Sequence, residues 1–221
     1  FFHICDRFKY LQKYKIDRKD HQIPSTRLIL KTLIGAIFQQ FIVEPVGFGI
    51  IIPQLWSKRY MNNNMWSNDD TSIANLWRVY LGFTFCDICN SWLFYIAHRI
   101  LHNKYLYGKI HKQHHEYNGT ISFAAEYAHP IESVLANSIP TLLGAVIIGA
   151  HPLQFMLWLA WRLQETYESH SGYSFYNTWL HKIGLTNADA VLFHDSHHTK
   201  NKGNYGRMFT DVLFGTYCNT D

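Results

Sequence analysis

Three long apolar stretches, separated by polar segments, organise this sequence. They run from Leu28 to Ile52, from Leu76 to Ala97 and from Ile131 to Leu163. An α-helix rises 1.5 Å per residue, so roughly 20 apolar residues cross a hydrocarbon core of about 30 Å. The first two stretches reach that length, and each predicts one membrane helix.

Breaks inside these stretches refine the prediction. The Glu44-Pro45 pair predicts a kink in the first stretch, because proline cannot donate the backbone hydrogen bond of a helix interior. His151-Pro152 divides the third stretch into two halves, each short for a membrane span. Two arrangements fit that division: a helical hairpin that enters and leaves on one side, or a pair of tilted spans.

Composition and charge agree with a membrane protein. Hydrophobic residues make up 48% of the chain and charged residues 16%, below the roughly 25% typical of soluble domains. The mean hydropathy of −0.15 averages apolar stretches with segments rich in His, Asn, Lys and Tyr. The net charge is +4, and basic residues gather near the start, which favours the cytoplasmic flank of a membrane helix over nucleic-acid binding. These basic residues are Arg7, Lys9, Lys13, Lys15, Arg18 and Lys19.

Other features of the sequence exclude several protein classes. Four cysteines are too few and too scattered for a disulfide scaffold. The sequence contains no glycine-rich phosphate loop of the G-x-G-x-x-G or P-loop kind.

The chain opens on Phe1 rather than Met, so we expect that a native N-terminus is missing.

The expected topology brings all histidine clusters to one side of the membrane. Two crossings from the basic flank return the chain to that side at His98, and the hairpin returns it again before His170. The sequence therefore predicts an all-α integral membrane bundle, a single domain over residues 1–221. Residues 98–129 and 164–221 would form its cytoplasmic, histidine-rich, di-metal cap.

Ten of the fourteen histidines carry the candidate chemistry. Within three clusters the spacing is i, i+4 or i, i+3, i+4, which places the members on one helical face. The clusters are His98 and His102, then His111, His114 and His115, and finally His194, His197 and His198. His129 and His170 lie between them in the sequence.

So many imidazoles exceed the coordination of one ion, which indicates two metals. Neutral imidazole suits iron, zinc or copper, whereas magnesium and calcium prefer oxygen ligands. Acidic residues beside the histidines are candidates to orient the rings by accepting hydrogen bonds: Glu116, Glu126, Glu165 and Asp195. The isolated histidines are expected to be structural: His3, His21, His151 and His181.

The order of the motifs along the chain resembles a known family. The motifs are His98-Arg99-Ile100-Leu101-His102, Ile110-His111-Lys112 with His114-His115-Glu116, Ala125-Glu126-Tyr127-Ala128-His129-Pro130-Ile131-Glu132, Glu165-Thr166, His170-Ser171-Gly172-Tyr173, His194-Asp195 with His197-His198, Gly203-Asn204-Tyr205 and Phe214-Gly215-Thr216. Together they resemble the fatty acid hydroxylase/sterol desaturase superfamily, and within it the C4-methyl sterol oxidases.

This resemblance implies a di-iron, O₂-dependent monooxygenase that oxidises a sterol 4-methyl group in sterol biosynthesis. It implies two iron ions held by the ten histidines, and zinc is an alternative occupant in a preparation. Its partners would be the lipid bilayer, the sterol, and a cytochrome b5-type electron donor with its reductase, but no nucleic acid. The implied location is the endoplasmic reticulum membrane with the histidines facing the cytosol, and another organelle membrane is the alternative.

Some positions depart from the family pattern. The family usually has an acidic residue seven positions before His98, where this chain has Ser91, and Asp87 lies one helical turn earlier. The segment before Phe214 is shorter than in relatives, and Tyr217 replaces an aspartate. We expect these changes to affect substrate and partner contacts more than metal binding.

Other functions stay open at this point. Within the superfamily, the chain could hydroxylate a fatty acyl or sphingolipid chain, or desaturate a sterol ring. A different class is a non-catalytic structural subunit of a membrane complex that retains the fold. A transport or zinc-storage protein would instead have histidines lining a transmembrane path.

Overall fold

The computed structural model describes residues 11–16, 24–45, 54, 56–58, 73–117 and 121–220. Apart from one antiparallel β-bridge between Lys15 and Tyr173, the regular structure of these residues is helical. The predicted all-α class is therefore confirmed for the described part of the chain.

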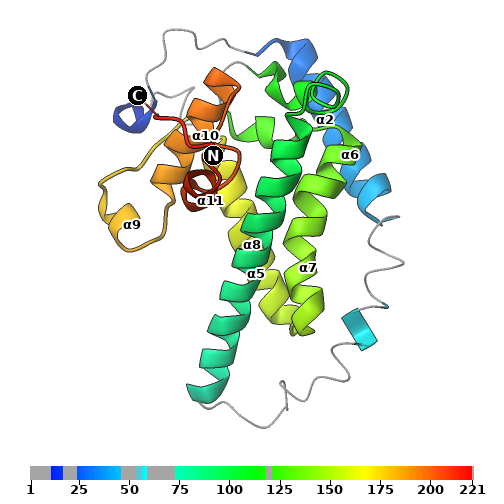
Figure 1. The fold of residues 1–221 in the computed structure, drawn as a ribbon, viewed down its shortest axis with the longest axis vertical. Coiled ribbons are helices and arrows are strands. Elements are labelled where there is room, and N and C mark those ends of the chain that lie inside the picture. Colours follow the sequence, from blue (N-terminus) through cyan, green and yellow to red (C-terminus); the bar gives the residue numbers. More distant parts are fainter. Residues whose placement is uncertain are drawn as a thin grey trace.

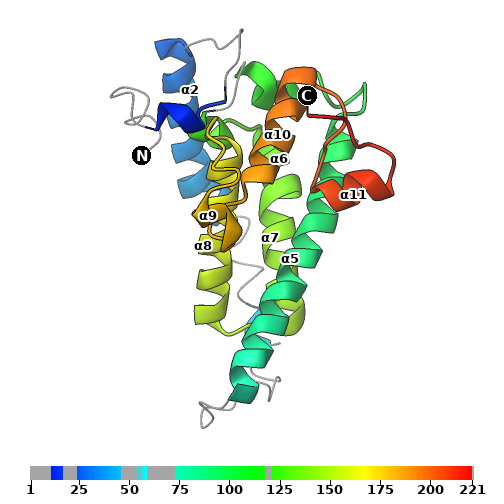
Figure 2. The same ribbon diagram turned by 90° about the vertical axis from the view of Figure 1, so that its left-hand side faces the viewer.

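Long helices form the body of the molecule (Figures 1 and 2). Helix α2 (Thr26–Phe38) continues into a π-helical segment, η2 (Gln39–Val43). Helix α5 (Ile73–Leu101) is the longest, and it packs along α7 (Ile139–Ile148). The short α6 (Pro130–Glu132) and the π-helical η6 (Ser133–Ser138) lead directly into α7, and α8 (Pro152–Ser169) follows it.

Shorter helices gather at one end of these long helices (Figure 1). They are η4 (His111–Glu116), η5 (Ser122–Glu126), α9 (Trp179–Lys182), α10 (Ala188–Lys200) and α11 (Met208–Leu213), with η1 (Gln12–Tyr14) near the N-terminus. The candidate ligands lie at this end, where α5 finishes and α10 packs on α8.

The break at His151-Pro152 is a tight helix–turn–helix connection. Gly149 ends α7 in the left-handed conformation at φ 58°, which glycine adopts without strain. His151 then caps α8 by accepting a hydrogen bond from the Leu153 backbone N–H, and Pro152 occupies the first helical position. The chain therefore turns back at this point, and α8 returns toward the end where the histidines lie (Figure 1).

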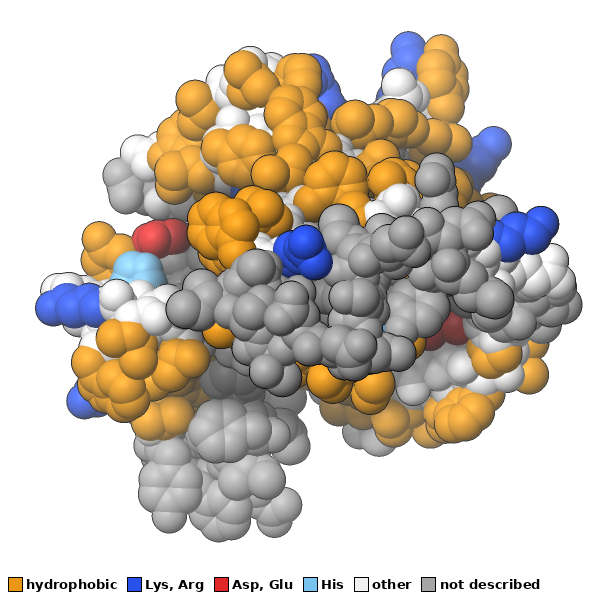
Figure 3. Space-filling view, turned by 90° about the horizontal axis from the view of Figure 1, so that it is seen from below, with side chains coloured by type: hydrophobic (Ala, Val, Ile, Leu, Met, Phe, Trp, Pro, Cys, Tyr) orange, Lys and Arg blue, Asp and Glu red, His pale blue; other side chains and the backbone are white. Residues whose placement is uncertain are grey.

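Among the described residues, three helices are long and apolar enough to cross a membrane. They are Thr26–Val43, Leu76–Leu101 and Pro130–Ile148. Large apolar side chains on them are exposed, including Ile34 at 61% and Phe41 at 71%. Figure 3 shows hydrophobic side chains prevailing over charged ones on the described surface. Such a surface suits lipid rather than water, so the chain is an integral membrane protein.

The first membrane helix is distorted earlier than the sequence indicates. Glu44 and Pro45 are still helical, and residues 46–52 of the expected span lie outside the described residues. The departure from α-geometry is η2, which directly precedes Glu44. A π-helical turn absorbs one extra residue within a helix and often marks a functional site.

Close packing fixes α5 against α7. A Cβ atom added at Gly144 would lie 2.8 Å from the Cys86 Cα, so only glycine allows this approach. Small residues let membrane helices come into van der Waals contact, where lipid offers no hydrophobic driving force. Cys86 and Ala145 belong to a buried cluster with Trp158 of α8, which joins the three helices.

Candidate metal centre

Nine of the ten predicted histidines meet at the end of the bundle. The five-histidine group comprises His98, His102, His111, His115 and His197, and the four-histidine group comprises His114, His170, His194 and His198. Within each group the candidate ligand atoms all lie within 4.8 Å of one another. Two adjacent sets of imidazole nitrogens are the arrangement that a two-metal centre requires.

The spacing of the histidines divides each of two clusters between the groups. The short 3₁₀ helix η4 directs His111 and His115 to the five-histidine group and His114 to the four-histidine group. Helix α10 likewise divides its histidines, sending His197 to one group and the other two to the second. Each of these two sequence clusters would therefore contribute to both metals rather than to one, because a single helix carries histidines of both groups.

The Nε2 atoms face one another at short range. In the five-histidine group, His111 Nε2 lies 3.0 Å from both His98 Nε2 and His115 Nε2. In the four-histidine group, His194 Nε2 lies 2.9 Å from His170 Nε2 and 3.0 Å from His198 Nε2. Ligand nitrogens about 2.1 Å from one ion and at right angles to each other would be about 3.0 Å apart.

Hydrogen bonds on the far side of the rings fix their tautomers. His98 Nδ1 lies 2.6 Å from the Tyr205 carbonyl oxygen, and His197 Nδ1 lies 2.6 Å from the carbonyl oxygen of Gly203. A carbonyl oxygen can only accept, so both rings carry their proton on Nδ1.

The Nδ1 atom of His111 likewise faces an oxygen acceptor, Glu132 Oε1, at 2.8 Å. The Nε2 lone pairs of His98 and His111 consequently face each other at 3.0 Å. Two lone pairs at that distance repel unless a cation lies between them. The tautomers and distances thus fit a bound transition metal, and the nine histidines are the residues that would hold it.

Burial keeps the imidazoles in the neutral, ligand form. It lowers the pKa of His111, His170 and His197 to about 3 and that of His114 to about 4, against an ordinary value near 6.5. Burial and the neighbouring His197 lower the pKa of His102 to about 2. Neutral histidines at physiological pH need not release a proton before they bind a metal.

His129 is the one predicted ligand that the structure does not bring into either group. It is the N-cap of α6, where its Nδ1 accepts a hydrogen bond from the Ile131 backbone N–H at 3.2 Å. The following Pro130 sets the start of that helix. A ligand role for His129 stays a prediction.

Glu132 was not among the predicted acids, yet its carboxylate contacts His111 of the five-histidine group. The expected glutamates have other partners: Glu116 accepts from the Tyr127 hydroxyl, Glu126 from the Tyr167 hydroxyl, and Glu165 from Arg207. Asp195 is buried on α10. One signal was available, because an acid at the start of an apolar stretch must face protein.

A short loop after α10 also positions ligands. The carbonyl groups that accept from His98 and His197 belong to Tyr205 and Gly203. Asp211 of α11 holds this loop, since its carboxylate accepts from the Tyr205 and Gly206 backbone N–H groups at 2.8 Å each. Asp211 is completely buried. Its role could not be inferred from spacing, because it acts through backbone atoms.

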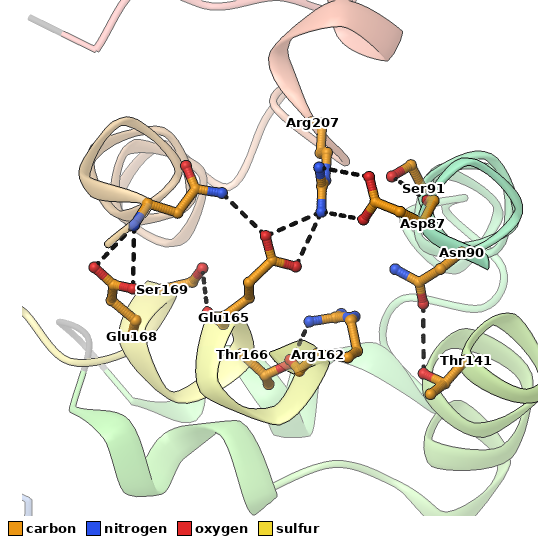
Figure 4. A network of polar contacts seen from close by, with 11 residues as sticks. Asp87, Asn90, Ser91, Thr141, Arg162, Glu165, Thr166, Glu168, Ser169 and Arg207 are labelled. Atoms are coloured by element: carbon orange, nitrogen blue, oxygen red, sulfur yellow. Dashed lines mark hydrogen bonds and ion pairs between the residues drawn. The ribbon is translucent and has the colours of Figure 1, made fainter. Parts of the chain in front are cut away.

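A network of charged residues joins α5, α8 and the residue before α11 (Figure 4). Two of its members, Glu165 and Arg207, line the same cavity as five of the histidines. Arg207 donates to both Asp87 carboxylate oxygens at 3.0 and 2.6 Å, and to both Glu165 oxygens at 3.0 and 2.9 Å. Asp87 thus faces protein within the membrane helix α5. The Ser91 hydroxyl donates to the Asp87 carbonyl oxygen at 2.8 Å. Where the family has an acid at the position of Ser91, this chain has Asp87 one turn earlier on α5 as the acid that binds Arg207.

One cavity is lined by histidines, and a second cavity lies next to it. The smaller, of about 90 Å³, is lined by five of them and by polar residues: His98, His111, His114, His170, His194, Asn90, Ser91, Arg162, Glu165, Asn187 and Arg207. The larger, of about 360 Å³, lies between η2, η6, α7 and α8. Ala125, Asn137, Arg162 and Thr166 line both cavities, so they mark the junction between the larger cavity and the histidines.

The order and spacing of these site residues match one family. The sequence profile of fatty acid hydroxylases matches residues 83–216, a range that contains all nine histidines of the two groups. The chain belongs to the fatty acid hydroxylase family. The resemblance read from the sequence motifs is therefore confirmed.

Three relatives show what the chain is similar to. Methylsterol monooxygenase 2-2 of Arabidopsis thaliana is 31% identical to it, over 97% of this chain and 78% of the relative. Methylsterol monooxygenase 1 of Gallus gallus is 32% identical, over 94% of this chain and 67% of the relative. Very-long-chain aldehyde decarbonylase GL1-11 of Oryza sativa subsp. indica is 40% identical, over 96% and 77%. No solved structure matches the chain at a significant level.

Proposed function

We propose that this chain is a di-iron, O₂-dependent membrane monooxygenase that oxidises the 4-methyl group of a sterol. The observation that carries the proposal is the pair of histidine groups, whose Nε2 atoms converge beside a cavity between membrane helices. The similarity to two methylsterol monooxygenases supports the choice of substrate. Two iron ions, when bound, would supply the activated oxygen that an aliphatic C–H bond requires.

The reaction balances with an external electron donor. One methyl C–H bond, one O₂, two electrons and two protons give an alcohol and one water, and two further rounds lead through the aldehyde to the carboxylate. We propose that a cytochrome b5-type donor and its reductase supply these electrons. The proposed location is the endoplasmic reticulum membrane, with the histidine end facing the cytosol.

The residues of this chain would have distinct tasks in that reaction. The nine histidines hold the metal, and Glu132 and the carbonyl groups of Gly203 and Tyr205 keep the rings in the ligand tautomer. The apolar and polar residues of the larger cavity would hold the lipid. Five of the nine histidines are buried, and limited access of water would protect reactive oxygen from side reactions.

The test is oxidation of a defined sterol by the full chain in lipid nanodiscs. The protein is loaded with iron, supplied with O₂ and a reductase system, and given a 4-methyl sterol, and the products are identified by mass spectrometry. We expect a 4-hydroxymethyl sterol and about two iron ions per chain. Iron at that ratio without any sterol product would refute the substrate, and absence of both iron and turnover would favour the non-catalytic subunit.

A second candidate substrate is a very-long-chain aldehyde. Its basis is the 40% identity to the rice aldehyde decarbonylase, which exceeds the identity to the methylsterol monooxygenases. Sterol and aldehyde given together to the same preparation distinguish the two candidates. Consumption of the aldehyde alone would establish the second one.

A further inference from the structure

We propose that Arg162 binds an oxygen substituent at the reacting end of the lipid, and so selects lipids that carry oxygen at or beside the oxidised carbon. This inference rests on the proposed function and deepens it. For a 4-methyl sterol, the oxygen is the 3-hydroxyl group, on the carbon next to the one that bears the methyl.

Arg162 occupies the junction between the two cavities. The residues that line both are Ala125, Asn137, Arg162 and Thr166, and Arg162 is the charged member of this set. A lipid that extends from the larger cavity toward the histidines must therefore pass the guanidinium. The polar end of the lipid, rather than its hydrocarbon body, would lie against it.

The guanidinium of Arg162 has N–H donors without an acceptor among the described residues. Among the described residues, its hydrogen bond is from Nη1 to the Thr166 hydroxyl, one turn along the same helix. Its Nε is buried and has no partner. A guanidinium has five N–H donors, and burial of a charged group without acceptors is costly. The site is therefore incomplete until an acceptor arrives.

The neighbouring charges are already engaged. Asp87 and Glu165 both accept from Arg207, which binds each of them through two oxygens. Arg162 instead lies over the ring of Phe94, with its Cζ 5.7 Å from the ring centroid. Phe94 also lines the smaller cavity, and its ring centroid is 5.1 Å from that of His98. The unsatisfied cation thus lies one aromatic ring away from the histidines.

Arg162 would therefore distinguish lipids by whether they carry an oxygen substituent. A hydroxyl or carbonyl oxygen gives Arg162 a charge-assisted hydrogen bond, and a lipid without one leaves its donors unpaired. Sites made to bind a hydroxyl group reject the analogue that lacks it much more strongly than apolar pockets reject a change in size. We expect a preference of roughly 10- to 100-fold in kcat/KM, as for one hydrogen bond to a charged group.

The experiment compares matched lipids with matched variants of the full chain in nanodiscs. The lipid pairs are a 4-methyl sterol with its 3-deoxy analogue, and a long-chain aldehyde with the alkane of equal length. The variant Arg162→Leu removes the donors, and Arg162→Lys keeps the charge. Gln164→Leu on the same helix is the control, because Gln164 is exposed and donates to the Leu185 carbonyl oxygen.

Two readouts are expected to agree. For the oxygen-bearing lipid, Arg162→Leu raises KM by about 10- to 100-fold with a smaller change in kcat, as expected when binding rather than chemistry is affected. For the deoxy lipid it changes little, and Arg162→Lys restores part of the preference. Equilibrium binding of the same lipids to the metal-free chain follows the same pattern, which separates lipid recognition from iron loading.

Three results would overturn the inference. Equal binding of both members of a pair by the wild type would show that no oxygen is recognised. Equal losses for both members in Arg162→Leu, with iron content and melting temperature unchanged, would show a packing role. Binding of neither pair by a folded, iron-loaded wild type would sink the proposed lipid oxidation itself, and with it this inference.

Discussion

The two histidine groups are similar in composition but differ in what holds them. In the five-histidine group, His98 and His111 donate through Nδ1 to acceptors on distant segments, Tyr205 and Glu132, and His197 donates to Gly203, six positions along the chain. Nδ1 of His115 is buried without a partner. In the four-histidine group, His170 donates to the Thr166 carbonyl oxygen of its own helix, and Nδ1 of His198 is buried without a partner.

The difference separates a site set by tertiary structure from one set mainly by local structure. Rings oriented by acceptors elsewhere in the fold are pre-organised for the ion, and such partners raise metal affinity. We therefore expect the five-histidine group to retain its ion more tightly.

Removal of one ligand from each group should cause the largest loss. In His197→Ala the five-histidine group loses a ligand that also lies beside His102, with Nε2 atoms 3.1 Å apart. In His170→Ala the four-histidine group loses a ring that lies beside His194, with Nε2 atoms 2.9 Å apart. We expect each variant to lose turnover completely and to bind about half of the iron, because ligands of one centre act as a unit. Metal analysis measures this, and wild-type iron content in either variant would contradict it.

Acid should destabilise the metal-free protein steeply. The pKa of His111, His170 and His197 is lowered by burial to about 3 in the folded chain, while in the unfolded chain it is near 6.5. Between these values the unfolded chain binds protons that the folded chain does not, so stability falls as the pH falls. Each such histidine costs about 1.4 kcal/mol per pH unit in that window. Denaturant titrations at pH 7 and pH 5 measure the loss.

The control for the acid experiment is the iron-loaded chain. Bound metal opposes protonation of its ligands, so unfolding should begin at a lower pH than in the metal-free chain. A metal-free protein that is equally stable at pH 7 and pH 5 would show that the histidines are not held neutral by the fold.

Glu132→Gln should weaken the five-histidine group selectively. The amide can still accept from His111 Nδ1, but it loses the negative charge that makes the imidazole more basic. Loss of such a partner typically reduces metal affinity by about 10- to 100-fold. Competition with a chelator measures it, and Glu126→Gln is the matched control because Glu126 accepts from Tyr167 rather than from a ligand. Equal losses of metal affinity in both variants would show that Glu132 does not support the metal centre.

His129→Ala should give the smallest effect and tests the remaining predicted ligand. Loss of this N-cap should lower the stability by about 1 kcal/mol, without a change in iron content. His129→Asn, which preserves a capping side chain, should recover the stability. Loss of one iron ion in His129→Ala would instead show that His129 is a metal ligand.

Features with a local cause were predictable from the sequence. Apolar length predicted membrane helices, and the three candidate spans begin within two residues of the expected starts, at Thr26, Leu76 and Pro130 against Leu28, Leu76 and Ile131. The turn at His151-Pro152 has its signals within four residues, from Gly149 to Pro152. Eight of the nine histidines were recognisable because their spacing repeats and their residue type is chemically specific, whereas His170 was predicted from the family resemblance.

Features that depend on distant contacts were not predictable. Arg207 reaches Asp87 across 120 positions, and nothing in the spacing of either residue indicates the pair. The division of η4 between two groups does not follow from its local geometry, because residues i and i+3 of a 3₁₀ helix eclipse and would bring His111 and His114 together. The structure instead groups His111 with His115. Asp211 acts through backbone amides, so its contribution has no side-chain pattern to find.

The loop that orients His98 and His197 is itself clamped by the end of the chain. Asn204 donates to the Cys218 carbonyl oxygen and accepts from its N–H, and the Asn204 N–H donates to the Thr216 carbonyl oxygen. Metal binding and closure of this tail are thermodynamically linked, because both stabilise one loop conformation. Limited proteolysis of residues 206–218 should therefore slow as iron is added, so that the rate of tail cleavage becomes a direct assay of site occupancy in a membrane preparation.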